Sequence, residues 1–125
     1  MEIEKKKKFS ISARLKSATH AWRGLGLLFQ TSHNTWGHIF FGLLAIYLGF
    51  ILHISNTEWL FIIFAIGLVL ITEALNSTIE IDINLTSPEY HPYARDTKDV
   101  AAGAVLLSVM LAIVVGIIIF LPKII

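Results

Sequence analysis

The segment "VAAGAVLLSVMLAIVVGIIIFL", Val100 to Leu121, contains no charged side chain. About 20 such residues are enough for an α-helix to cross the ~30 Å hydrocarbon core of a bilayer. The whole chain of 125 residues shares this character, with 55% hydrophobic and only 15% charged residues. A soluble domain of this size could not bury so much apolar surface. The sequence therefore predicts a single domain, 1–125, that is an all-α integral membrane protein.

Two more apolar stretches precede this segment, "WGHIFFGLLAIYLGFILHI" from Trp36 and "WLFIIFAIGLVLITEAL" from Trp59. Each has about the length of a membrane span. We therefore predict three transmembrane helices, at 36–54, 59–81 and 100–121.

The links between these spans differ in length. "SNTE", Ser55 to Glu58, is so short that the first two spans must form an antiparallel hairpin. The second link contains Pro88 and Pro92, and proline interrupts a helix because it lacks the N–H group. We expect an ordered loop there.

The N-terminal part predicts a different kind of helix. After a basic tail at 1–9, with four lysines at Lys5–Lys8, apolar residues recur every three or four positions on one face of a helix at 10–30. Ser10 and Ser12 are both candidate N-caps. A basic amphipathic helix is expected to lie in the membrane surface, or to pack on the protein's own bundle, and the two are compatible. No signal-peptide pattern follows the basic start, which is therefore expected to belong to the mature protein.

Lys and Arg residues predict the orientation. Seven of the ten precede the first span, and Arg95 and Lys98 lie in the second link. The first link has none, and only Lys123 follows the third span. The positive-inside rule places the N-terminus and the second link in the cytoplasm and the C-terminus outside. The net charge of +1 gives no indication of nucleic-acid binding, and the absence of cysteine excludes thiolate chemistry.

Polar residues gather where the second span ends, in "ITEALNSTIEIDINL", Ile71 to Leu85. Glu73, Asn76, Ser77 and Glu80 share one helix face. A carboxylate at the depth of Glu73 costs a few kcal/mol unless it is paired, protonated or hydrated, so it is a candidate functional residue. Asp82 and Asn84 could equally be the solvated exit of the helix.

Two such carboxylates can divide the work of phosphoryl transfer. A partly desolvated Glu73 could accept a proton from a hydroxyl, and Glu80, nearer water, could hold Mg²⁺. Lys98 could pair with phosphate oxygens. The P-loop pattern of nucleotide-binding proteins is absent from the sequence. A proton-coupled transporter therefore remains an alternative on these residues alone.

Small residues form a stripe on the third span, at Ala104, Ser108, Ala112 and Gly116. Such a stripe allows close helix contact, and Gly42 and Gly49 could do the same in the first span. We interpret both as packing features.

Three motifs in order, "EALNSTIE" (Glu73–Glu80), "EYH" (Glu89–His91) and "KDVAAGAVLL" (Lys98–Leu107), resemble the prokaryotic diacylglycerol kinase family, which includes the undecaprenol kinases. The resemblance covers nearly the whole chain. It implies a homotrimeric membrane kinase that uses ATP and Mg²⁺, with active sites shared between neighbouring subunits. "AAGAVLL" is somewhat similar to the undecaprenol kinases.

The resemblance also implies residue roles. Glu73 matches the catalytic base, Glu80 a metal ligand and Asn76 a residue that organises the site. The residues that match the nucleotide site are His20, Glu89, Tyr90, His91, Lys98 and Asp99. Asn34 and His38 match a pattern seen in many members.

One position departs from the family pattern. Ser32 stands where a second metal-binding glutamate is usual, and a hydroxyl is a weaker metal ligand than a carboxylate. Water and phosphate oxygens could complete the metal site, Asp96 or Asp99 could compensate, or activity could be lost.

The expected function is phosphorylation of a membrane lipid alcohol. The substrate predicted first is 1,2-diacylglycerol, giving phosphatidic acid, and undecaprenol is the alternative. A proton-coupled transporter and a noncatalytic membrane protein are the alternatives of another class.

Overall fold

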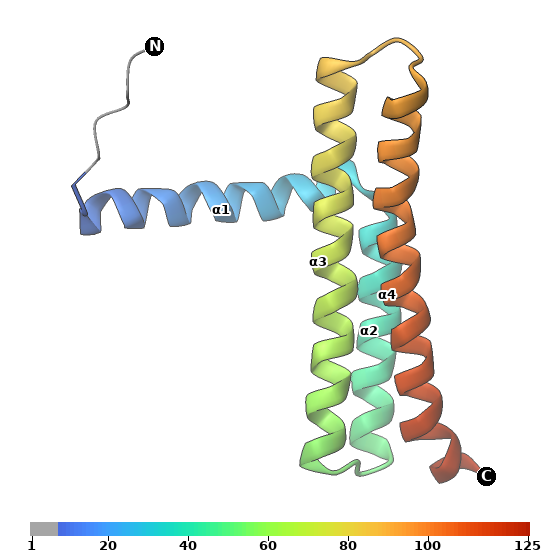
Figure 1. Ribbon diagram of the computed structural model, residues 1–125. Helices are drawn as coiled ribbons and strands as arrows, with labels where there is room; N and C mark the ends of the chain where they lie inside the picture. Colours follow the sequence, from blue (N-terminus) through green and yellow to red (C-terminus); the bar gives the residue numbers. More distant parts are fainter. Residues whose placement is uncertain (1–7) are drawn as a thin grey trace.

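The computed structural model describes residues 8–125, which form four α-helices and no strand. The helices are α1 (Ile11–Thr31), α2 (His33–Ile51), α3 (Asn56–Thr86) and α4 (Pro92–Ile124). Helices α2, α3 and α4 run side by side, while α1 leaves the bundle sideways (Figure 1). The predicted basic tail lies outside the described residues over positions 1–7.

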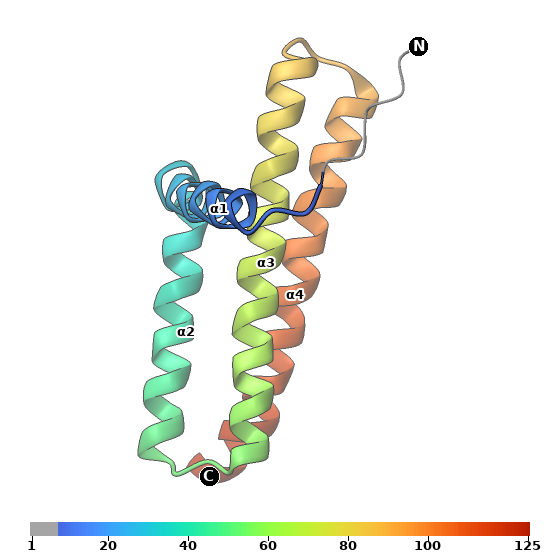
Figure 2. The ribbon, with the colours of Figure 1, turned by 90° about the vertical axis from the view of Figure 1, so that its left-hand side faces the viewer.

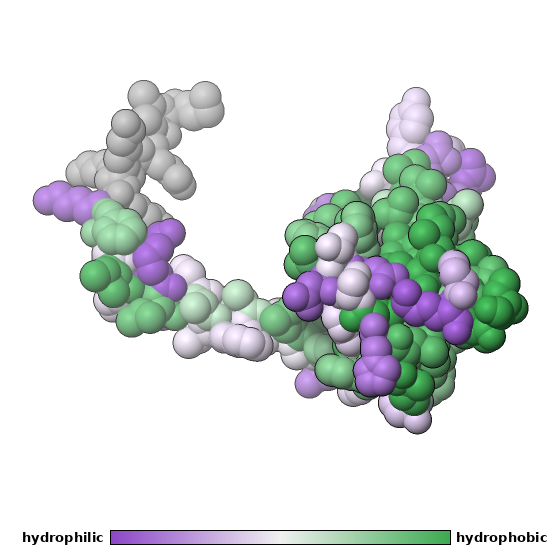
Figure 3. Space-filling model, turned by 90° about the horizontal axis from the view of Figure 1, so that it is seen from below, coloured by the Kyte–Doolittle hydropathy of each residue, from purple (hydrophilic) through white to green (hydrophobic). Residues whose placement is uncertain are grey.

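Helices α2, α3 and α4 are each long and apolar enough to cross a membrane, which confirms the all-α membrane fold with three spans. Large apolar side chains cover the flanks of the bundle in the single chain; Phe41, Phe64 and Ile118 are 67%, 74% and 67% exposed. Figure 3 views the bundle from the end with the α2–α3 turn, where hydrophilic groups face the viewer within a hydrophobic rim. This surface suits contact with lipid or with another copy of the chain.

Two helices extend farther than the sequence predicts. Helix α3 continues to Thr86 instead of ending at 81, and α4 begins at Pro92 instead of 100. The expectation that Pro92 belongs to a loop is wrong, because proline is tolerated in the first turn of a helix, where its missing N–H group is not needed. The His91 side chain caps this end by accepting a hydrogen bond from the Tyr93 backbone N–H at 3.2 Å. The two helices therefore project as a pair beyond the level of α1 (Figures 1 and 2).

The turn from α2 to α3 is tightly specified. His53 has a positive φ of 50°, and the Ile54 N–H bonds back to the Gly49 carbonyl at 3.2 Å, a Schellman-type end of α2. A capping box follows, in which Ser55 Oγ accepts from the Glu58 N–H at 3.2 Å and Glu58 Oε1 accepts from the Ser55 N–H at 2.9 Å. The predicted antiparallel hairpin of the first two spans is confirmed.

The corner between α1 and α2 lies at Ser32, whose backbone is extended. The Trp36 indole N–H reaches back across it to the Phe29 carbonyl at 3.0 Å. The Ser10 side chain caps α1 by accepting from the Ala13 N–H at 3.3 Å. Only Leu28, near the corner, is buried on α1, so this helix projects away from the bundle instead of packing along it (Figures 1 and 2). This arrangement matches the predicted surface helix.

Candidate active site

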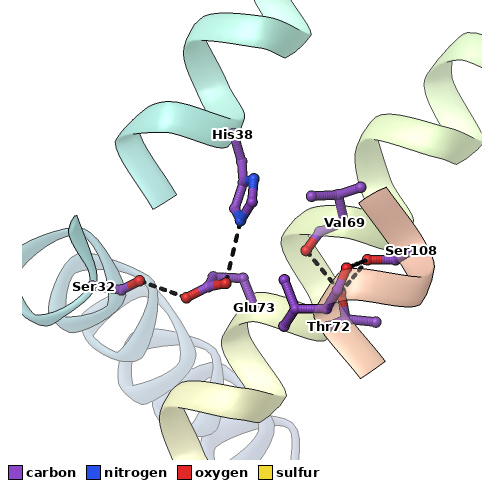
Figure 4. A network of polar contacts seen from close by, with 7 residues as sticks. Ser32, His38, Val69, Thr72, Glu73 and Ser108 are labelled. Atoms are coloured by element: carbon purple, nitrogen blue, oxygen red, sulfur yellow. Dashed lines mark hydrogen bonds and ion pairs between the residues drawn. The ribbon is translucent and has the colours of Figure 1, made fainter. Parts of the chain in front are cut away.

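Glu73 is held on both sides of its carboxylate. The side chain lies on α3 and is only 2% exposed. Ser32 Oγ donates a hydrogen bond to Oε1 at 2.7 Å, and His38 Nε2 lies 3.2 Å from Oε2 (Figure 4). Charge-assisted hydrogen bonds of this kind compensate a buried carboxylate for the loss of water. The corner after α1 thus fixes the depth at which Glu73 lies.

Two buried polar atoms, on residues one turn along the helix from His38 and from Glu73, make no hydrogen bond within residues 8–125. Thr35 is fully buried between Ser32 and His38 on α2, and Asn76 is 7% exposed one turn after Glu73. Thr35 Oγ1 and Asn76 Oδ1 make no hydrogen bond within residues 8–125. Buried polar atoms are normally satisfied, so both are candidates to contact substrate, water or a metal ion.

Glu80 lies on the same face of α3, two turns or about 10 Å beyond Glu73, and is exposed. Across residues 8–125, no group of three or more His, Asp or Glu side chains is placed to hold a metal ion. Mg²⁺ needs only one or two carboxylates, because water and substrate phosphates supply its other ligands. The orphaned Asn76 oxygen lies one turn from Glu80, so this pair fits a magnesium ion completed by a nucleotide.

A hollow of about 250 Å³ opens at the link between α3 and α4. Five of the residues predicted for the nucleotide site line it: Glu89, Tyr90, His91, Lys98 and Asp99. Lys98 Nζ donates to Asn84 Oδ1 at 2.7 Å, which ties α4 to α3. Arg95 also lines the hollow and donates to the Tyr90 hydroxyl at 3.1 Å.

The structure separates other predicted residues from this hollow. His20 lies on the exposed part of α1 and does not line it. Ser32 has Glu73 as its partner, so its metal-binding role stays a prediction. Asp96 pairs with Arg95 at 3.4 Å, with both side chains more than half exposed.

An apolar groove of about 300 Å³ is lined at one end by His38, the hydrogen-bond partner of Glu73. His38 lies at its polar end, and its walls come from α2, α3 and α4, including Gly42, Ile66 and Gly116. Of the small-residue stripe on α4, Ser108 packs on α3 through a 2.8 Å hydrogen bond to Thr72 (Figure 4), whereas Ala112 lines the groove.

Residues 19–120 match the family profile described as prokaryotic diacylglycerol kinase. The undecaprenol kinase of Bacillus subtilis is 36% identical over 108 residues, which cover 86% of this chain and 88% of that protein. The chain belongs to the prokaryotic diacylglycerol kinase family. The diacylglycerol kinase of Synechocystis sp. is 37% identical over 109 residues, which cover 62% of that longer protein, and that of Escherichia coli K12 is 28% identical over 100 residues, or 82% of that protein. The prediction of a lipid kinase is thereby confirmed.

Within this candidate site, sequence reasoning missed four contacts. Ser32 was considered only as a weak metal ligand, although it donates to Glu73. His38 was noted only as part of a pattern, although it bonds Glu73. Asn84 was open to interpretation as a solvated helix end, although it accepts from Lys98. Asn84 lies about three helical turns after Glu73 and therefore on the same face of the helix, a spacing that could have indicated a role for it. Nothing in the sequence indicated that Arg95 would contact Tyr90.

Proposed function

We propose that this protein transfers the γ-phosphoryl group of ATP to a primary hydroxyl of a membrane lipid at Glu73. The single observation that carries the proposal is a buried carboxylate that is held by Ser32 and His38, where His38 also lines the end of an apolar groove. A lipid that places its chain in the groove presents its hydroxyl at that depth.

Glu73 would accept the proton of the lipid hydroxyl while the hydroxyl oxygen attacks the γ-phosphorus and ADP leaves. Glu80 and Asn76 would hold Mg²⁺, which offsets the negative charge of the phosphates when bound. Lys98 would add positive charge near the phosphates from the nearby hollow. Positioning and electrostatics supply most of the catalysis in phosphoryl transfer.

The nucleotide would lie along α3, with its base in the hollow formed by Glu89, Tyr90, His91, Lys98 and Asp99. Asn84, the partner of Lys98, lies about 16 Å beyond Glu73 along the helix axis. An extended triphosphate pointing toward the membrane would pass Glu80 before it reaches Glu73.

A homotrimer would complete the site. Helix α1 extends far from its own bundle and carries His20 away from the hollow. A neighbouring subunit could receive that helix, and the exposed apolar flanks support an assembly. The charge asymmetry supports a multi-pass protein of the bacterial cytoplasmic membrane with its active site on the cytoplasmic side.

Two lipids are candidate substrates. Diacylglycerol is the substrate predicted from the sequence and is named in the kinases of Synechocystis sp. and Escherichia coli. Undecaprenol is favoured by the match to the Bacillus subtilis enzyme, which covers most of both chains. Both lipids carry a primary hydroxyl at the membrane surface, so the same chemistry serves either.

The test is to incubate the purified protein in mixed micelles with radiolabelled ATP, Mg²⁺ and either dioleoylglycerol or undecaprenol. We expect label in one of these lipids and none without Mg²⁺. Label in neither lipid, from a folded protein that binds ATP, would overturn the proposal. Proton flux without ATP use would favour the transporter, and absence of nucleotide binding would favour a noncatalytic protein.

A further inference from the structure

We propose that Ser32 and His38 are positioning residues that form a two-sided clamp on the Glu73 carboxylate and aim it at the lipid hydroxyl. This inference rests on the proposed role of Glu73 as the base. It assigns the corner between α1 and α2 a catalytic purpose that does not depend on a metal ion.

The two partners approach the carboxylate from different places in the fold. Ser32 is the residue at the corner, with its hydroxyl 2.7 Å from Oε1. His38 is nearly two turns into α2, with Nε2 3.2 Å from Oε2. Because one contact goes to each oxygen, the two together fix the rotation of the carboxylate plane, which neither could do alone (Figure 4).

The chemistry of the partners defines their roles. An ionised carboxylate only accepts hydrogen bonds, so the Ser32 hydroxyl donates to it, and His38 donates when its proton is on Nε2. The side chain of His38 is 19% exposed and that of Glu73 is 2% exposed, so the clamp lies at the boundary between the protein interior and the groove. The Thr35 hydroxyl, on the same face of α2, makes no hydrogen bond within residues 8–125 and is a candidate for a further polar contact in the site.

The clamp also explains why a serine suits position 32 at this corner better than a carboxylate would. A carboxylate at position 32 would face Glu73 with a second negative charge, and two such groups repel unless a cation lies between them. A hydroxyl makes the contact without any cation. The Ser32 clamp therefore predicts that loss of the hydroxyl changes turnover and leaves the Mg²⁺ requirement unaltered.

Two matched pairs of variants test the clamp. Ser32→Val and Ser32→Thr have nearly the same shape, and only the threonine keeps the hydroxyl. His38→Leu removes the donor, and His38→Gln keeps one. We expect Ser32→Val and His38→Leu to lower kcat about 10- to 100-fold with little change in the KM for ATP, because a misplaced base slows chemistry more than nucleotide binding. Ser32→Thr and His38→Gln should recover most of that loss.

Thr31→Val is the control, because Thr31 lies next to Ser32 but its hydroxyl bonds only to the Leu27 carbonyl of its own helix, at 2.7 Å. This variant should keep the parent kcat. The Mg²⁺ concentration for half-maximal activity is measured for every variant. A rise in that concentration for Ser32→Val without a fall in kcat would make Ser32 a metal ligand and overturn the clamp, as would unchanged kcat in both Ser32→Val and His38→Leu.

A second measurement keeps the clamp testable if the parent protein phosphorylates neither lipid. A double-mutant cycle of thermal unfolding in detergent combines Ser32→Val with Glu73→Gln, and His38→Leu with Glu73→Gln. Non-additive shifts of the unfolding midpoint would show that the contacts exist although the proposed function had failed. Additive shifts would overturn the clamp even if the protein is an active lipid kinase.

Discussion

The proposed role of Glu73 combines two demands that usually conflict, because a base must be able to change its protonation state and a buried charge must be compensated. Its partners are a serine and a histidine, neither of which carries a permanent positive charge. The neighbours of Glu73 thus hold its carboxylate in place by hydrogen bonds, without a fixed positive charge beside it.

Glu73→Gln should lower kcat for lipid phosphorylation by about 10²- to 10⁴-fold, the usual contribution of a general base. Glutamine has the same shape but cannot accept the proton. The measurement is a steady-state assay with the preferred lipid, alongside the unfolding midpoint. Thr78→Val is the control, because Thr78 is exposed and lies about one turn after Glu73 on α3. This variant should leave kcat unchanged. Near-normal turnover of Glu73→Gln would exclude this residue as the base.

Lys98→Met should lower kcat/KM for ATP by about 10²-fold, because it removes the positive charge that we propose lies near the phosphates. Asn84→Leu tests whether the effect is only structural, since Asn84 is the observed hydrogen-bond partner of Lys98. We expect Asn84→Leu to lower kcat/KM for ATP much less than Lys98→Met does. Equal losses in both variants would indicate that Lys98 serves only to join α3 to α4.

At the scale of elements, the α2–α3 hairpin depends on the close approach of Gly49 on α2 to the Trp59 ring on α3. A Cβ atom at Gly49 would lie 2.6 Å from the Trp59 ring and 3.0 Å from Ile54. Gly49→Ala should therefore lower the free energy of unfolding by about 1–3 kcal/mol, the usual cost of overpacking.

The matched control for this hairpin is Gly67→Ala on α3, where a Cβ atom would meet nothing within 4 Å in the single chain. Alanine favours a helix over glycine by about 1 kcal/mol, so Gly67→Ala should be neutral or stabilising. Both variants can be compared by denaturant titration in detergent. A Gly49→Ala protein as stable as the parent would mean that Trp59 can move aside.

At the scale of the whole molecule, orientation is testable because the chain contains no cysteine. Thr86→Cys and Asn56→Cys place single thiols at opposite ends of α3. In spheroplasts, an impermeant maleimide should label Asn56→Cys, and it should label Thr86→Cys only after the membrane is opened. The reverse pattern would contradict the orientation derived from the positive-inside rule.

The proposed homotrimer makes a second prediction at this scale, because a neighbouring subunit would receive α1. Co-reconstituted Glu73→Gln and His20→Ala proteins should regain activity, because a subunit that keeps Glu73 then receives α1 from a neighbour that keeps His20. Each variant reconstituted alone is the control. Activity of the mixture equal to the sum of the two would indicate that each subunit carries a whole site.

The sequence by itself determined the fold class, because a helix that crosses lipid must satisfy its own backbone and be apolar over about 20 residues. The charge-free run Val100–Leu121 therefore fell within α4, and the apolar spacing at 10–30 predicted α1 almost to the residue. The face shared by Glu73, Asn76 and Glu80 followed from helix periodicity alone. Helix ends were predicted less well, because α3 and α4 support each other beyond the membrane, where hydropathy gives no signal.

Only the tertiary structure decided which side chains meet. Ser32 and His38 lie 41 and 35 residues from Glu73 in the chain, and no local pattern specifies that both bond its carboxylate. The pairing of Lys98 with Asn84 likewise depends on how α4 packs against α3. Periodicity fixes the face on which a residue lies, whereas its partner depends on the rotation and depth of the neighbouring helix, which are set by packing contacts such as that between Gly42 and Ile66.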